Sequence, residues 1–572
     1  MKNSISILGI TVFLLLGVHY ANAGGSSETT EQAQAATVPF SKGMNFSFWF
    51  DGGSGPRGAQ AIQFSRYNEQ EFANVKRLGV DVIRLPIDLG FFTSGAPGYT
   101  LDPFFFRLLD MAVDWAEKYQ IYIILVNMPE PPAPTNNNYR NFLIQVWTQM
   151  AEHYKNRSEY VIYEILNEPN GISTRDWGRM QGEVIDAIRR IDQNHWIVVS
   201  GTDYSSIETL SSLPRYSDNK LLYTFHFYEP FAFTFQGDAS AGSPVDKFAE
   251  LPFPYDRNRM PVMPAELRET GFIRNYPNDA TTAALTRKID QAANFARQRN
   301  VPVFCGEFGV MKLFAPPEDR IRYIQSVRET LEARNIPWSM FCYFDHWGIF
   351  KSQIDGLGYL QWNSWGDFNT DLDVELVRAL GLTPVPQRQR QKEPLRSGFT
   401  IYDDSFGRGL SFQNNRREGG GGQQTVNLYY TPPAEGEYAI HLGNIGDSDD
   451  FSIMLKSDFN DLSYLVQNGY VFEFKAKTET PASFVILFYN YKDNITWAYV
   501  QGIDQRLLPP DGRWRTIRIP LRDFQLLGGT DIITRQSLEP RGNVSWDNIF
   551  MLQINATNGT RDIYLDDIKI TR

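Results

Sequence analysis

The sequence predicts a (β/α)8 barrel of the TIM type, followed by a smaller all-β sandwich of the jelly-roll type. Two observations predict the barrel. Eight apolar segments alternate with helical patterns over residues 38–382, and two of these segments end in a glutamate beside a chain breaker. Strands that alternate with helices form parallel βαβ units, and eight such units are the size of one barrel. A third observation predicts the sandwich, because short alternating strands replace helices over residues 399–572.

The predicted barrel strands are apolar runs bounded by glycine, proline or polar residues. In chain order they are residues 43–50, 80–87, 121–126, 161–168, 196–201, 221–228, 301–309 and 338–344. Helical patterns cover residues 69–78, 103–119, 139–154, 177–192 and 373–380. Residues 383–398 are polar and carry several prolines, so we expect a linker there.

Two glutamates stand at the ends of predicted strands. Glu168 follows an apolar run, and the strand is expected to stop at Pro169, which cannot donate to a sheet ladder. Glu307 ends a second run of the same kind, beside Gly306 and Gly309. Active sites of (β/α)8 barrels lie at the carboxyl ends of the strands. A pair of carboxylates at that face is the arrangement that glycoside hydrolysis needs.

The motifs Asn167-Glu168-Pro169 and Gly306-Glu307-Phe308-Gly309 resemble those of glycoside hydrolase family 5, in the clan of retaining (β/α)8 glycosidases. The resemblance implies that Glu168 is the acid/base and Glu307 the nucleophile. A retaining mechanism places the two carboxyl groups about 5–5.5 Å apart, whereas an inverting one needs about 6.5–9.5 Å. Glu168 is also expected to have a raised pKa, because it must be protonated at working pH.

Further residues fit the same resemblance. Arg84 is a charge in an apolar strand and needs a partner, which the resemblance identifies as the carboxylate of Glu307. His226 and Tyr228 are two residues apart in a strand and therefore share a face. The resemblance places His226 on the acid/base side and Tyr228 against Glu307. It also implies that Asn167 hydrogen-bonds the sugar 2-hydroxyl.

The sequence departs from the family at two strand ends. The third predicted strand lacks the expected histidine motif, and either Asn127 or Glu130 could replace it. The eighth lacks the expected tryptophan, and we interpret Trp347 as the platform under the cleaved sugar. Residues 229–280 form a long insertion rich in Phe, Pro and Tyr, which we predict to be one wall of a substrate cleft. Because of these two departures, the sequence does not determine which glycan is the substrate.

Composition limits the kinds of partner. The 572 residues carry a formal net charge of -11 with dispersed Lys and Arg, which argues against nucleic acid and fits a neutral polysaccharide. The two cysteines, Cys305 and Cys342, are predicted to be small buried residues. No His, Cys and Asp residues have metal-binding spacing, so we expect no cofactor and no catalytic metal. A structural calcium ion in the sandwich stays open as an alternative.

The amino-terminal residues predict export. Lys2, the apolar run Ile5 to Val18 and Ala21-Asn22-Ala23 form a signal peptide over residues 1–23. The run is shorter than the ~20 apolar residues that span a bilayer. Residues 24–37 are predicted to be a disordered leader. We therefore expect a secreted monomer, extracellular or periplasmic, without membrane attachment.

The second domain is predicted from short strands at residues 438–442, 470–475, 483–489, 496–501, 513–519 and 563–570. Its ending, Asp562 to Ile568, resembles the last strand of jelly-roll carbohydrate-binding modules. In a hairpin that turns at residues 493–494, one face carries Tyr489 and Tyr491, and one carries Trp497 and Tyr499. One such face is either a sugar platform or sandwich core, because periodicity does not identify the inner face.

The function that these observations predict is a secreted endo-β-1,4-glucanase, similar to a cellulase. Within the same family, β-mannanase, xyloglucanase and lichenase are the alternatives. A barrel that binds polysaccharide without cleaving it is the alternative from another class, but such a protein would lack one of the two carboxylates. An α/β hydrolase would need a Gly-x-Ser-x-Gly elbow, which the sequence does not contain.

Overall fold

The computed structural model describes residues 38–51, 58–65, 67–129, 137–351, 366–389, 393–407, 409–416, 426–444, 449–455, 460–492, 495–531, 536–540, 545–556 and 560–572. The predicted signal peptide, the predicted leader, Glu130 and the hairpin turn at 493–494 lie outside these residues. Among the helices that are described, none combines the length and the apolar character needed to cross a membrane.

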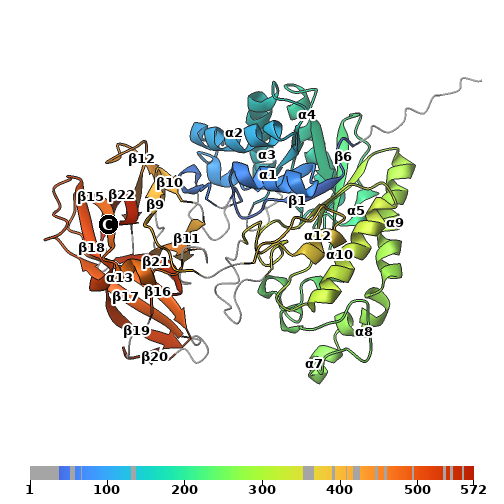
Figure 1. Cartoon of the computed structure of the whole chain (residues 1–572). Coiled ribbons are helices and arrows are strands. Elements are labelled where there is room, and N and C mark those ends of the chain that lie inside the picture. Colours follow the sequence, from blue (N-terminus) through green and yellow to red (C-terminus); the bar gives the residue numbers. More distant parts are fainter. Residues whose placement is uncertain are drawn as a thin grey trace, which may run out of the picture. The chain divides into compact units, whose positions relative to one another are not determined.

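Eight parallel strands close into a barrel, as the sequence predicts (Figure 1). They are β1 (Lys42–Asn45), β2 (Val82–Ile87), β3 (Tyr122–Asn127), β4 (Val161–Glu164), β5 (Trp196–Ser200), β6 (Leu221–Phe227), β7 (Val303–Phe308) and β8 (Trp338–Met340). Each strand pairs with its neighbours in sequence, and β8 closes the barrel onto β1. The carboxyl ends of all eight strands therefore meet at one face.

Helices alternate with the strands. They include α1 (Glu69–Leu78), α2 (Pro103–Lys118), α3 (Asn137–Tyr154), α4 (Thr174–Arg189), α5 (Ile207–Leu210), α9 (Thr282–Arg299), α10 (Pro317–Glu332) and α12 (Val374–Ala379). Local signals set their ends. Asn68 caps α1 by accepting from Gln70 N, and Gly79 ends it in the left-handed conformation. Asp102 caps α2 ahead of Pro103, which fits the first helical turn because it needs no N–H there.

Three strands end at least four residues earlier than predicted. β1 stops at Asn45, β8 at Met340, and β4 at Glu164, four residues before Glu168. After β4 the chain leaves the ladder, and Asn167 N donates to Asn127 O instead. Glu168 then adopts φ 46°, a left-handed conformation outside any strand. The prediction that Glu168 closes its strand is therefore wrong in detail, because an apolar run does not reveal where pairing stops.

Inward-facing side chains fill the barrel in layers, and the layer nearest the carboxyl ends of the strands is polar. Six inward side chains, one from each of β2 to β7, form an apolar layer inside the barrel together with Phe40, which precedes β1. The six are Val82, Ile124, Ile162, Val198, Leu222 and Phe304. Side chains alternate along a strand, so the next inward positions on β2 and β4 are Arg84 and Glu164. The charged groups thus lie one layer above the apolar layer, toward the carboxyl ends of the strands.

The insertion after β6 contains short helices: α6 (Phe231–Thr234), η3 (Ala239–Ala241), η4 (Val245–Lys247), α7 (Ala265–Arg268) and α8 (Gly271–Asp279). Buried Phe233 and Phe253 pack against Tyr323 of α10. Tyr323 OH in turn donates to Glu229 O at 2.9 Å. The beginning of the insertion is therefore fastened to the barrel.

The segment predicted as the start of the linker also lies against the barrel. Thr383 N donates to Leu78 O, and Arg388 N donates to Asn369 O. Val385 is buried within the barrel core. A shortened chain that keeps these contacts therefore has to extend past residue 388.

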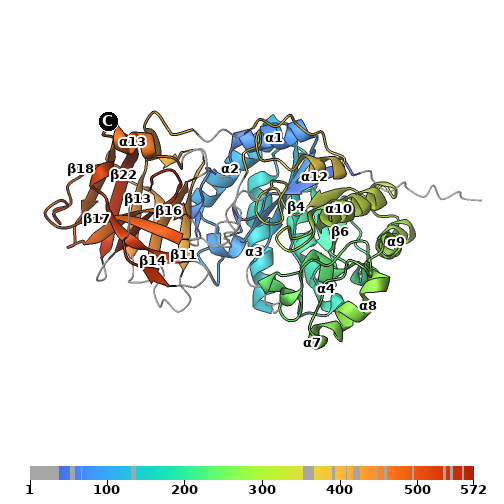
Figure 2. The same cartoon turned by 60° about the horizontal axis from the view of Figure 1, so that its bottom comes forward.

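The second domain consists of two antiparallel seven-stranded sheets (Figure 2). The first contains β9 (Phe399–Asp403), β10 (Ser405–Phe406), β12 (Val426–Tyr430), β13 (Ala439–Asn444), β15 (Val471–Thr478), β18 (Arg515–Pro520) and β22 (Arg561–Thr571). The second contains β11 (Leu410–Arg416), β14 (Asp449–Leu455), β16 (Phe484–Lys492), β17 (Ile495–Ile503), β19 (Gln525–Asp531), β20 (Ser537–Leu538) and β21 (Ile549–Ala556). Both sheets contribute side chains to one apolar core, which confirms the predicted all-β fold.

Candidate active site

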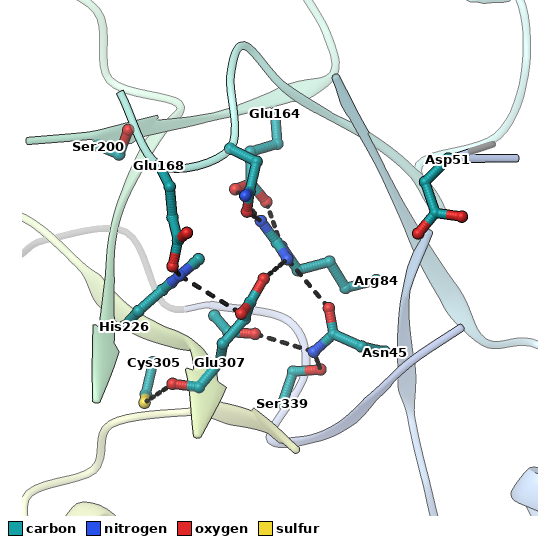
Figure 3. Close-up of polar contacts among 12 residues, drawn as sticks. Asn45, Asp51, Arg84, Glu164, Glu168, Ser200, His226, Cys305, Glu307 and Ser339 are labelled. Atoms are coloured by element: carbon teal, nitrogen blue, oxygen red, sulfur yellow. Dashed lines mark hydrogen bonds and ion pairs between the residues drawn. The ribbon is translucent and has the colours of Figure 1, made fainter. Parts of the chain in front are cut away.

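Arg84 of β2 is the centre of the polar cluster inside the barrel (Figure 3). Its side chain is fully buried and makes five hydrogen bonds. Two of them, from Nε at 2.8 Å and Nη2 at 2.7 Å, hold both oxygens of Glu164. The other three reach Glu307, Asn45 and Asn167. Every donor of the guanidinium fork thus has a partner, as a buried cation requires.

Glu307 of β7 is held through both carboxylate oxygens. Arg84 Nη1 donates to Oε1 at 2.6 Å, and Tyr228 OH donates to Oε2 at 2.9 Å. Burial and the nearby carboxylates raise the pKa of Tyr228 well above its usual range, so the phenol keeps the proton that it donates. Arg84 and Tyr228 therefore fix the position of a carboxylate that is itself almost fully buried.

Glu168 lies across from Glu307, and His226 of β6 stands between them (Figure 3). His226 Nδ1 shares a 2.7 Å hydrogen bond with Glu168 Oε1 and lies 3.5 Å from Glu307 Oε2. Burial raises the pKa of Glu168, and the hydrogen bond with His226 only partly opposes this effect. Burial acts to lower the pKa of His226, but the charges of Glu307 and Glu168 outweigh it, so that pKa is raised. The Glu168–His226 pair therefore retains a proton where a general acid needs one.

The same three side chains are the cluster best suited to a metal ion. Glu168, His226 and Glu307 each bring one ligand atom within 4.8 Å of the others, and no other group of His, Cys, Asp and Glu in the described part of the chain does so. Two carboxylates and an imidazole suit a transition-metal ion. Carboxylates and an imidazole are also the side chains that proton transfer and nucleophilic attack require.

Asn167 and Asn127 differ in what their side chains do. Asn167 Oδ1 accepts from Arg84 Nη2 at 2.8 Å, so the NH2 group is the part of this side chain that can donate to a ligand. Asn127 Nδ2 donates to Tyr139 OH, and its Oδ1 accepts from Leu89 N. Asn127 also accepts the Asn167 N–H on its backbone oxygen, so it supports the loop that carries the site.

Trp347 is only 4% exposed, which disagrees with its predicted role as a sugar platform. Its ring packs edge-on against Tyr228 and Phe235, with centroid distances of 5.8 and 4.8 Å. Phe341 follows β8 directly, is only partly buried and lies 6.0 Å from the Trp347 ring. Phe341 therefore fits a platform at the end of the eighth strand better than the buried Trp347, whose ring meets that of Phe341 edge-on.

Sequence reasoning missed Glu164, although one signal was available. Glu164 is a buried carboxylate in an apolar strand and so required a cationic partner, as Arg84 required an anionic one. It also missed Asn45, whose Nδ2 donates to Gly306 O and Ser339 Oγ. Asn45 thereby ties β1 to β7 and β8 beneath Glu307. No pattern within β1 points to that role.

Cys305 and Cys342 are both buried, as predicted. Cys305 Sγ donates to Glu307 O at 3.4 Å, and Cys342 Sγ donates to Phe344 O at 2.6 Å. Burial raises the pKa of Cys305 well above the usual range, so it is a poor nucleophile.

The four aromatic residues of the predicted platform lie on two faces of the second sheet. Tyr499 stacks on Trp546 at 4.4 Å within the sandwich core, and Trp497, two residues away, points to the same side. Tyr499 therefore follows the core alternative, whereas Trp497 is only partly buried and is not among the side chains of that core. Tyr489 and Tyr491 lie on the opposite face, where Tyr489 OH donates to Gln553 Oε1 and Tyr491 packs beside Met454.

Comparisons with known proteins agree with this architecture. Residues 42–346 match the model of cellulase, glycosyl hydrolase family 5, and residues 405–572 match carbohydrate binding domain 30. Endoglucanase 3 of Fibrobacter succinogenes is 29% identical over 363 residues, a match that covers 58% of this chain and 53% of that protein. The chain thus spans about half the length of that relative.

Two further proteins are similar over the barrel. Endoglucanase C of Acetivibrio thermocellus is 25% identical over 326 residues, covering 54% of this chain and 92% of that protein. The crystal structure of an endoglucanase from Thermotoga maritima is 20% identical, with a TM-score of 0.48, and covers 59% of this chain and 96% of that chain. Because the cellulase model alone matches more than half of the residues, the chain belongs to glycosyl hydrolase family 5.

Proposed function

We propose that this protein is a secreted, endo-acting β-1,4-glucanase that hydrolyses cellulose or related β-glucans with retention of configuration. Membership of glycosyl hydrolase family 5 supports the reaction class. The names of the two curated relatives, both endoglucanases, support the substrate. The match of residues 405–572 to a carbohydrate-binding domain supports a polymeric rather than a small substrate.

The observation that carries the mechanism is the spacing of the two carboxylates. Facing oxygens of Glu168 and Glu307 lie within 4.8 Å of each other, and one imidazole nitrogen of His226 contacts both groups. This spacing fits the roughly 5–5.5 Å between carboxyl groups of retaining enzymes. It favours a retaining over an inverting mechanism, because inverting enzymes separate the two carboxyl groups by about 6.5–9.5 Å to fit a water.

In the first step Glu168 gives its proton to the glycosidic oxygen while Glu307 attacks the anomeric carbon. The bond to the leaving sugar breaks, and an ester bond to Glu307 forms. Arg84 and Tyr228 hold Glu307 through separate oxygens, so the attacking group is already placed before substrate binds. Asn167 donates to the sugar 2-hydroxyl, a contact that strengthens in the oxocarbenium-like transition state.

In the second step Glu168, now a carboxylate, takes a proton from water, and the water oxygen attacks the anomeric carbon. The ester to Glu307 breaks, and both glutamates return to their starting protonation states. Before substrate binds, His226 Nδ1 lies 2.7 Å from Glu168 Oε1. Its raised pKa supports a role in keeping the proton near Glu168 between the two steps.

The second domain is proposed to hold the enzyme on polysaccharide. The face of the second sheet that carries Tyr489 and Tyr491 also carries Phe550 and Met551, so it offers rings on the side away from the core. Sugar rings stack on aromatic faces of this kind. We also propose export, on the basis of the predicted signal peptide.

The test is hydrolysis by the full chain on a panel of soluble cellulose derivative, mixed-linkage glucan, mannan and xyloglucan. Highest kcat/KM on a β-1,4-glucan, with release of internal fragments and a β-anomeric first product by NMR, is expected. Preference for mannan or xyloglucan would replace the substrate but keep the mechanism. Binding without hydrolysis on all four would favour the non-catalytic alternative.

A further inference from the structure

A row of aromatic rings leads away from the nucleophile on the insertion that follows β6. Tyr228, which donates to Glu307, contacts Phe235 with ring centroids 5.1 Å apart. Phe235 stacks on Phe231 at 4.3 Å, and Phe231 lies 6.5 Å from Phe272 of α8. We call Phe235, Phe231 and Phe272 the aromatic strip. It is continuous with the active site through ring contacts alone.

Exposure increases along the aromatic strip with distance from Glu307. Phe235 is partly buried, Phe231 is 36% exposed and Phe272 is 40% exposed. Large apolar side chains that remain exposed side by side indicate a binding surface more often than scattered single ones do. Among the described residues, no Lys or Arg cation lies over any of these three rings. The strip is therefore suited to an uncharged partner.

The backbone under the aromatic strip is fixed. Thr234 of α6 hydrogen-bonds Tyr228 O through Oγ1 at 2.6 Å, and its own carbonyl accepts from Met311 N at 2.9 Å. Phe248, only 1% exposed, packs edge-on against Phe272 at 6.4 Å. Rings held in place before binding lose little conformational entropy when a ligand arrives.

We infer that the aromatic strip is a distal subsite for a neutral β-linked glucan chain, several sugar units from the bond that is cleaved. The inference rests on the proposed function, because it assumes a glycan bound at Glu168 and Glu307. Pyranose rings present flat apolar faces, and aromatic side chains stack on such faces. Continuity with Tyr228 favours an extension of the same glycan over an unrelated protein partner. The insertion would thereby give the enzyme its preference for long substrates.

The experiment compares a long and a short substrate. We expect the double variant Phe231→Ala/Phe272→Ala to lower kcat/KM on mixed-linkage glucan by about tenfold, and to leave kcat/KM on p-nitrophenyl cellobioside within about twofold of wild type. The variant Phe231→Trp keeps a ring and should retain most of the activity on the long chain. Met111→Ala on α2, where Met111 is 37% exposed, is the matched control and should change neither substrate.

Three outcomes would overturn the inference. The first is undiminished activity of the double variant on the long glucan, and the second is an equal loss on both substrates, which indicates a structural role. The third is a wild-type dimer in sedimentation that the double variant converts to monomer, which would make the strip an interface between copies. Wild-type protein without activity on either substrate would instead refute the proposed function.

Discussion

Replacing Arg84 with lysine tests whether the buried guanidinium organises the site. Arg84 makes five hydrogen bonds, to Glu164, Glu307, Asn45 and Asn167. A lysine ammonium has three donors and is a compact point charge, so at least two of the five bonds must be lost. The charge is kept, and the variant therefore measures geometry rather than electrostatics alone.

The magnitude follows from the number of bonds lost. Hydrogen bonds that involve a charged group contribute about 1.5–3 kcal/mol each, so two lost bonds cost about 3–6 kcal/mol in total. Part of this cost lowers the free energy of unfolding. The rest is lost transition-state stabilisation, because Glu307 is no longer held in its attacking position. Each 1.36 kcal/mol of this loss lowers the rate tenfold. We expect kcat/KM to fall at least about 100-fold and the midpoint of thermal unfolding to fall by several degrees.

The assay measures kcat/KM per folded protein on a soluble glucan, with circular dichroism to determine the folded fraction. Arg189→Lys is the matched control, because Arg189 also holds a carboxylate, that of Asp218, but beside the amino ends of the strands. It should keep wild-type kcat/KM. Arg84→Lys with more than about a tenth of wild-type kcat/KM and an unchanged unfolding midpoint would refute the assignment of Arg84 as the organising residue.

Five further changes have defined outcomes. Glu307→Gln should abolish hydrolysis without altering circular dichroism, because the change is nearly isosteric; residual turnover on every glycan would exclude it as nucleophile. Activity should fall as pH rises through the raised pKa of Glu168, because the acid must be protonated. His226→Ala removes two influences that lower that pKa, so the alkaline limb of the kcat profile should move to higher pH; a move to lower pH contradicts this. Gly306→Ala would place a Cβ 2.6 Å from Thr224 Oγ1 and 3.3 Å from His226 Nε2, so β6 must shift; we expect kcat to fall about tenfold or more, measured beside thermal unfolding. A chain of residues 38–389 should keep activity on soluble glucan and lose part of it on insoluble cellulose; equal activity on both would argue against binding by the second domain.

Much of the barrel could be predicted because its signals are local. Helix α1 begins and ends at the predicted residues. The Asn68 side chain caps its first turn, and Gly79, which has no Cβ, adopts the left-handed conformation that ends it. Apolar runs located all eight strands, because parallel strands are buried on both faces. The end of β4 at Glu164 was not predictable in this way, since pairing with β3 and β5, rather than composition, decides where the ladder stops.

The site was only partly predictable for a related reason. Glu168, Glu307 and Arg84 could be identified because each is a charge at or beside an apolar strand. Whether Trp347 or Phe341 faces a sugar depends on how the chain packs after β8, and period-two alternation says nothing about a loop. In the sandwich, period-two alternation correctly placed Tyr489 and Tyr491 on one face of the sheet. Which face is the inner one became clear only from the structure, where Tyr499 stacks on Trp546 in the core.

The two glutamates differ in what holds them, and the difference supports their separate roles. Glu307 accepts a hydrogen bond on each oxygen, one of them from a permanent cation, so it is fixed in place as an attacking group must be. Glu168 has one side-chain partner, His226, and stands outside the strand ladder with a pKa raised by burial. A group in that environment can give up its proton in the first step and regain one in the second, and neither transfer breaks a hydrogen bond of Arg84. Exchanging the roles would require Glu307 to release Arg84 at every turnover, at the cost of leaving a buried cation without its partner.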